Sequence, residues 1–108
     1  ADLPIHLRTD DLYAYYIDLI SRATQRIWLA APYATRFAIA PLDRASKQGP
    51  LDVRLICRLN LTDIVAGSVD PLALAELVQS GTSVRSASAV LHAKAWVIDD
   101  VFAMGSAI

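Results

Sequence analysis

One apolar segment near the end of this 108-residue chain holds one of its two histidines and one of its two lysines. His92 and Lys94 are two residues apart, and in a β-strand their side chains point to the same face, about 6.5–7 Å apart along the chain. An imidazole and an ammonium at that spacing can hold one phosphate group between them. Asp99 follows after four residues, and Gly105-Ser106 stands in the next apolar segment. The pattern therefore predicts a phosphate site on two neighbouring strands.

Each of these residues has a simpler interpretation when taken alone. His92 and Lys94 on an edge strand would be ordinary solvent-facing side chains, and Gly105-Ser106 would be an ordinary strand end. His6 is expected to be a tail residue without a partner. The spacing of all five residues together favours the phosphate site over these alternatives.

The elements that must position this site are expected from hydrophobic periodicity and capping. Apolar residues at helical spacing follow capping residues or proline in three segments, and β-prone apolar runs lie between them. We expect helices over residues 9–24, 35–47 and 70–80, strands over 26–31, 52–59 and 82–86, and a loop over 60–69. Segments 91–98 and 101–108 flank Asp99-Asp100 and predict a β-hairpin. The second helix is expected from the helical spacing of its apolar residues, and Pro41 is expected to delay or kink it. These residues are Phe37, Ile39, Ala40, Leu42 and Ala45. Helices that alternate with strands indicate an α/β fold with a mixed sheet.

Composition excludes several classes of protein. The chain is 55% hydrophobic with a formal net charge of −1, so it is neither disordered nor a basic nucleic-acid-coating protein. Its single cysteine, Cys57, permits no intramolecular disulfide and is expected to be an inert buried thiol. No apolar run reaches the roughly 18 residues of a membrane-spanning helix. A mean hydropathy of +0.38 is high for so small a chain and predicts a face covered by a partner subunit.

The segment from His92 to Ser106 closely resembles the signature of the phospholipase D superfamily, His-x-Lys-x4-Asp followed by Gly-Ser-x-Asn. Residues 26–33 and 52–59 resemble the first two core strands of that family. The resemblance implies an α/β/α sandwich with a mixed sheet, helices on both faces and the motif on a C-terminal hairpin. It also implies that residues 1–108 form a single half-domain, incomplete at its C-terminal end. Ile108 stands where the family has asparagine.

The resemblance also implies roles for the motif residues. His92 would attack a phosphodiester phosphorus, or protonate the leaving oxygen, while the histidine of a second motif takes the other role. Lys94, Ser106 and Gly105 would bind the phosphate oxygens. Asp99 belongs to the catalytic motif, and its place at the hairpin tip gives it a structural role that orients the turn. The resemblance further implies a reaction that requires no metal ion and no cofactor.

These expectations combine into a metal-independent nuclease that acts through a phosphohistidine on nucleic acid, with DNA as the expected substrate. Since one histidine cannot act on both sides of the phosphorus, we expect a homodimer or a second motif supplied in trans. We expect a cytoplasmic protein, with a secreted or periplasmic location left open. The alternatives are a phospholipase or phosphatidyltransferase, and a non-catalytic binding or dimerisation module, which Ile108 favours.

Tyrosines and arginines outside the motif could contact nucleic acid. Tyr13, Tyr15 and Tyr16 could stack on bases, although helical spacing places at least Tyr15 or Tyr16 in the core or an interface. The arginines are expected to form a solvated surface, from which one or two could reach phosphates. They are Arg22, Arg26, Arg36, Arg44, Arg54 and Arg58.

The register of the hairpin decides which motif residues share a face. A two-residue loop would pair Lys94 with Gly105 and turn Ser106 to the wrong face. A bulge or a three-residue turn would pair Lys94 with Ser106 and bring position 108 beside His92. We therefore expect the longer turn. In that register Ile108→Asn should raise the rate of phosphodiester hydrolysis.

Overall fold

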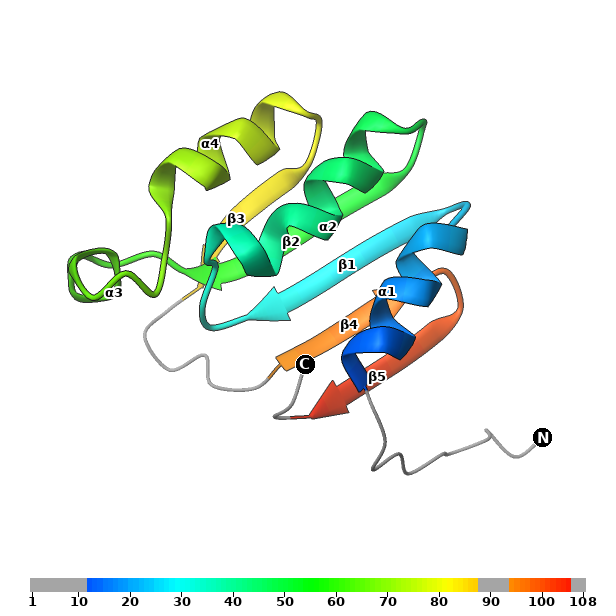
Figure 1. Ribbon diagram of the computed structural model, residues 1–108, viewed down its shortest axis with the longest axis horizontal. Helices are drawn as coiled ribbons and strands as arrows, with labels where there is room; N and C mark the ends of the chain where they lie inside the picture. The colour runs from blue at the N-terminus through cyan, green and yellow to red at the C-terminus, as the bar shows by residue number, and fades with distance from the viewer. Residues whose placement is uncertain (1–11, 88–93, 106–108) are drawn as a thin grey trace.

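Five strands form one mixed sheet, in the order β3-β2-β1-β4-β5 (Figure 1). The computed structural model describes residues 12–87 and 94–105. Strands β1, β2 and β3 are parallel, while β4 is antiparallel to both of its neighbours, β1 and β5. The elements are α1 (Leu12–Arg22), β1 (Arg26–Ala31), α2 (Arg36–Lys47), β2 (Asp52–Arg58), α3 (Leu61–Val65), α4 (Pro71–Gln79), β3 (Ser83–Ala87), β4 (Lys94–Ile98) and β5 (Val101–Gly105). The α/β class and the mixed sheet expected from the sequence are confirmed.

Capping side chains fix where the helices begin. The Thr35 hydroxyl accepts a hydrogen bond from the backbone N–H of Ala38, and Asp70 caps the first turn of α4 in the same way ahead of Pro71. Because Thr35 supplies the cap, α2 begins at Arg36, and Pro41 does not delay it.

Helix α3 corrects the expected loop over residues 60–69. Its cap is Asn60, whose side-chain oxygen accepts from the N–H of Asp63, while the Asn60 amide donates back to the Asp63 carboxylate. This reciprocal pair satisfies the first turn of a helix only five residues long. The sequence signal was present in Asn60 and Asp63, but the short segment carries no hydrophobic periodicity.

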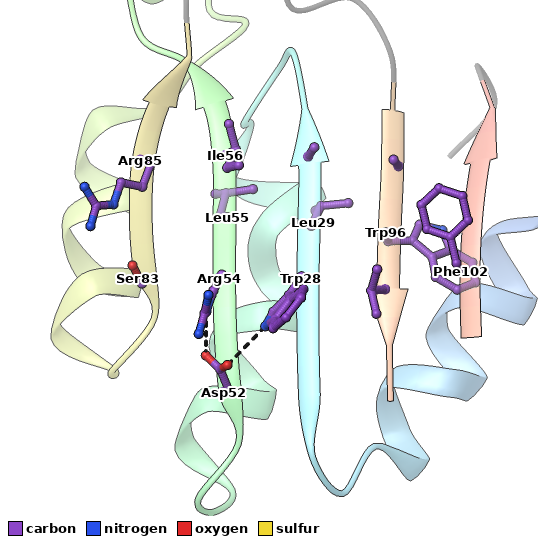
Figure 2. Close-up of a pocket in the computed structure, with 13 residues that line it drawn as sticks. Trp28, Leu29, Asp52, Arg54, Leu55, Ile56, Ser83, Arg85, Trp96 and Phe102 are labelled. Atoms are coloured by element: carbon purple, nitrogen blue, oxygen red, sulfur yellow. Dashed lines mark hydrogen bonds and ion pairs between the residues drawn. The ribbon is translucent and has the colours of Figure 1, made fainter. Parts of the chain in front are cut away.

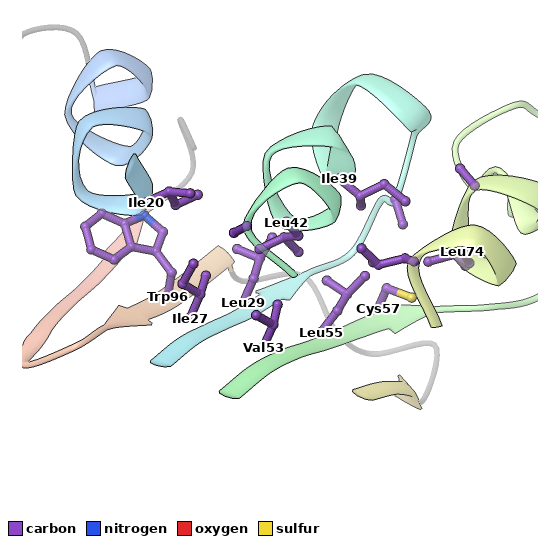
Figure 3. Close-up of a cluster of buried hydrophobic side chains, with 14 of the residues drawn as sticks. Ile20, Ile27, Leu29, Ile39, Leu42, Val53, Leu55, Cys57, Leu74 and Trp96 are labelled. Atoms are coloured by element: carbon purple, nitrogen blue, oxygen red, sulfur yellow. The ribbon is translucent and has the colours of Figure 1, made fainter. Parts of the chain in front are cut away.

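The hydrophobic core lies between the sheet and the helices α1, α2 and α4 (Figure 3). Alternate residues of the strands enter it, and helix residues on one face meet them. The fully buried large side chains are Trp96, Ile27, Leu42, Leu55, Leu77, Ile98 and Cys57. Phe37 is not among them, because it lies in the first turn of α2 and stacks on Tyr13 instead.

The opposite face of the sheet carries no helix of the described residues (Figure 2). Its side chains include Trp28, Arg54, Ile56 and Phe102, which line a shallow hollow of ≈ 670 Å³. The sequence predicted helices on both faces of the sheet. Within residues 12–87 and 94–105 the helices cover only one of the two faces. Parallel strands occur almost only with both faces covered, so this apolar surface is suited to a second layer.

The motif hairpin turns through two residues, not three. Ile98 pairs with Val101 and Lys94 pairs with Gly105, so the register expected from the sequence is wrong. Asp99 takes φ 50°, a left-handed conformation that aspartate tolerates better than most residues. This conformation closes the short turn without a bulge. The argument that an asparagine at position 108 would lie beside His92 does not apply in this register.

Candidate active site

Lys94 is the first residue of β4 and lies at the end of the sheet where the parallel strands finish. Ala95 pairs with Ala30 near the last residue of β1, and β4 runs antiparallel to β1. Lys94 shares its face with Trp96 and Ile98, which are buried against the helices, and is itself half-buried. In open α/β sheets, ligands bind beyond the carboxyl ends of the parallel strands. Lys94 therefore lies where the fold favours a ligand site.

Of the other candidate residues for phosphate binding, the structure describes only Gly105. Gly105 is the last residue of β5 and lies directly opposite Lys94. His92, Ser106 and Ile108 lie outside the described residues. The structure therefore brings Lys94 and Gly105 together, and the roles of His92 and Ser106 stay predictions.

The Asp99 carboxylate holds the connection between α1 and β1. One of its oxygens accepts from the backbone N–H of Gln25 at 2.8 Å and of Arg26 at 3.1 Å, and the other accepts from that of Thr24 at 3.1 Å. The Asp99 N–H in turn donates to the Arg26 carbonyl at 3.0 Å. Asp99 therefore fastens the motif hairpin to a segment more than seventy residues earlier.

Comparison with protein families gives a match over most of the chain. The family described as cardiolipin synthase, PLD-like domain, matches residues 16–107, which include both core strands and the whole motif hairpin. The chain belongs to the phospholipase D superfamily. No curated protein matches the chain.

In this phospholipase D-like domain most of the candidate arginines are already paired. Four of the six form ion pairs with carboxylates at N···O distances of 2.6–3.4 Å. The pairs are Arg22–Asp18, Arg36–Glu76, Arg54–Asp52 and Arg58–Asp63. The pKa of the Asp52 carboxyl lies below its ordinary value, and the largest cause is the hydrogen bond that Arg54 donates to it. The expectation of a solvated surface is confirmed for Arg22, Arg36 and Arg54, whose side chains are more than half exposed. It is wrong for Arg58, whose side chain is only 12% exposed because it packs at the end of β2 beside Asp63.

The single cysteine and the lengths of the helices bear on two further expectations. Cys57 is fully buried on β2, and burial raises the pKa of its thiol, so it is the inert core residue that was expected. No helix among the described residues is long and apolar enough to cross a membrane.

A row of aromatic rings that the sequence did not predict leads from the motif strand to the surface. Trp96 of β4 contacts Tyr15 and Tyr16 of α1, with ring centroids 6.1 Å and 5.8 Å away. Tyr13 lies 6.4 Å from Tyr16, and Phe37 of α2 lies 6.0 Å from Tyr13. Burial of Tyr16 confirms the expected core tyrosine. The tyrosines were a recognisable signal, but their partners come from two other elements.

Tyr16→Phe should leave the free energy of unfolding unchanged or raise it by about 1 kcal/mol. The Tyr16 hydroxyl is buried and has no hydrogen-bond partner among the described residues, and burial raises its pKa. Removing it therefore relieves an unpaired polar group while the ring stays in place. Urea denaturation measures the change, with Tyr13→Phe as the control at a more exposed ring. A loss above about 1 kcal/mol would show that the hydroxyl is bonded in the folded protein.

Proposed function

We propose that this chain is a phosphodiester hydrolase whose nucleophile is His92. Membership of the phospholipase D superfamily supports hydrolysis of a phosphodiester. The observation that carries the proposal is the position of Lys94, at the ligand-binding end of the sheet and two residues from His92 in sequence. Lys94 neutralises a non-bridging oxygen as negative charge grows in the transition state.

The proposed reaction proceeds in two displacements. The neutral imidazole of His92 attacks phosphorus, and the bond from phosphorus to the leaving oxygen breaks as a second histidine gives that oxygen a proton. Water then attacks the phosphohistidine, the phosphorus–nitrogen bond breaks, and the second histidine takes the proton that water loses. The backbone of Gly105, which lies opposite Lys94, binds the phosphate oxygens. Ser106 is not used in this step, because the observed register turns the position after Gly105 to the other face. Each step is in line, so the two histidines stand on opposite sides of the phosphorus.

The second histidine is proposed to come from another copy of the motif. Within one chain the remaining histidine is His6, which the motif does not include. A homodimer, or a second motif in trans, supplies the missing acid. The apolar sheet face opposite the helices supports association, because it leaves large side chains such as Phe102 exposed.

Nucleic acid is the substrate we propose, with DNA as the expected form. A phospholipid is the other substrate class, and the description of the matching family favours it. The alternative to an enzyme is a non-catalytic module for binding or dimerisation. It is favoured by Ile108, which replaces an asparagine whose amide could bind a phosphate oxygen.

Hydrolysis of bis(p-nitrophenyl) phosphate in excess chelator, measured over a dilution series, tests the proposal. We expect turnover to persist in chelator, and the specific activity to fall on dilution as dimers separate. Sedimentation of the same samples gives the fraction of dimer. Turnover that stops in chelator, or a monomer with undiminished specific activity, would contradict the mechanism. A folded, dimeric protein without turnover would support the non-catalytic module.

A further inference from the structure

The outer end of the aromatic row is an exposed, parallel ring pair. Tyr13 and Phe37 lie with centroids 6.0 Å apart and planes within 14°, whereas the inner contacts are tilted by 45–50°. Offset parallel stacking at this distance is a favourable arrangement for two aromatic rings. Phe37 is 75% exposed and Tyr13 40% exposed, so Phe37 keeps a ring surface open to solvent. The pair can accept a further ring on that surface.

The fold holds this pair in place from two directions. Phe37 lies in the first turn of α2, which the Thr35 cap fixes directly after β1. Tyr13 lies in the first turn of α1, one turn before the buried Tyr16, which contacts Trp96. A stacking surface anchored in the core loses little conformational entropy when it binds a ring, which favours affinity.

The ring pair lies at the same end of the sheet as Lys94. Trp96, at the inner end of the row, is two residues from Lys94 on the same face of β4. Helix α1 begins over the end of the sheet where β4 starts and β5 finishes (Figure 1). Helix α2 begins at this end too, because it follows the last residue of β1. A molecule whose phosphate lies at Lys94 can therefore extend towards Phe37.

We propose that Phe37 and Tyr13 form a stacking site for a nucleobase of single-stranded nucleic acid whose phosphodiester is bound at Lys94. This inference rests on the proposed function and names its substrate class. A base in a single strand presents a free π-face, whereas a base in a duplex is stacked on its neighbours. A flat ring on an open ring surface gains more from stacking than a flexible acyl chain does. Because every base has such a face, the site recognises bases without regard to sequence.

Binding of a fluorescent single-stranded deoxyoligonucleotide, measured by anisotropy, tests the inference. The matched probe is an abasic strand of the same length, which keeps the phosphates and lacks the bases. Both are measured in a His92→Ala background, so that the probes are not consumed and binding is independent of hydrolysis. We expect Phe37→Ala to weaken binding of the base-containing strand about 5- to 100-fold and to leave the abasic strand unchanged.

Three variants separate stacking from other effects. Phe37→Trp should retain binding, since it keeps an aromatic face, whereas Phe37→Leu should lose it although it stays apolar. Val78→Ala removes an exposed apolar side chain in the last turn of α4 and should have no effect. Equal losses for both probes, or full binding by Phe37→Leu, would overturn the stacking site.

Sedimentation with phosphatidylglycerol vesicles tests whether Phe37 belongs to a lipid-binding site instead. If Phe37→Ala reduced sedimentation with vesicles and left the oligonucleotide bound, the ring would belong to a lipid site and the inference would be wrong. Hydrolysis is measured separately with bis(p-nitrophenyl) phosphate. Absence of turnover would overturn the proposed function without changing the binding comparison, so the two failures are distinguishable.

Discussion

His92→Ala is expected to reduce the rate of phosphodiester hydrolysis by a factor of about 10³–10⁴. The same histidine acts as nucleophile in one copy and as general acid in the other, so the substitution removes both groups from a homodimer. Turnover of bis(p-nitrophenyl) phosphate by the purified dimer measures the loss. His6→Ala is the matched histidine control and should retain full activity. Hydrolysis unchanged in His92→Ala would exclude the phosphohistidine mechanism.

Lys94→Met belongs to the same experiment and should lower turnover about 10²–10³-fold. Methionine keeps the unbranched stem and removes the charge that we propose for the phosphate oxygens. Lys94 is half-buried at the start of β4, and methionine keeps an apolar stem of similar length at this position, so the fold should survive.

The chain offers an equivalent lysine as the control for charge. Lys47 lies in the last turn of α2, where it pairs with Asp43 at 2.9 Å. Lys47→Met should leave turnover unchanged. If both lysine variants lost activity equally, the effect would come from the net charge of the protein and not from a phosphate contact at Lys94.

Asp99→Ala is expected to lower the free energy of unfolding by about 2 kcal/mol. The carboxylate accepts three backbone N–H groups of residues 24–26, and alanine accepts none. Alanine also tolerates the φ of 50° at this position less well than aspartate does. Chemical denaturation measures the loss. Asp100→Ala is the control in the same turn, because Asp100 is exposed, and should change stability by less than about 0.5 kcal/mol.

The contribution of Asp99 should also depend on pH. Burial raises the pKa of its carboxyl, but the N–H groups of Gln25, Arg26 and Thr24 together lower it more, so the folded value lies below the ordinary one. The folded protein therefore binds this proton less readily than the unfolded chain. The stabilisation is complete above the unfolded pKa of about 4 and is lost as the pH falls through the folded pKa.

Asp99→Asn isolates this effect, since asparagine tolerates the same backbone conformation. The difference in unfolding free energy between the wild type and Asp99→Asn should shrink as the pH is lowered from 7 to about 3. A difference that stays constant over this range would show that the carboxylate charge does not hold the α1–β1 connection.

Local chemistry in the sequence was sufficient for most of the elements. Thr35 and Asp70 mark helix starts, Pro71 suits a first helical turn, and the apolar runs at 26–31 and 52–59 form the central strands. Helix α3 was missed because five residues are too few to show a period. Phe37 fits the helical spacing that predicted α2, but the spacing did not show that it stacks on Tyr13 of another helix.

The sequence by itself determined the family, through the spacing of His92, Lys94 and Asp99, because each of these intervals lies within one short segment. Only the tertiary structure decided the register that sets Gly105 opposite Lys94. It also decided the attachment of Asp99 to residues 24–26, and the contacts that join Tyr13, Phe37 and Trp96 in one row. These features join elements far apart in the chain, and their geometry depends on packing and turn conformation that local residue patterns do not specify.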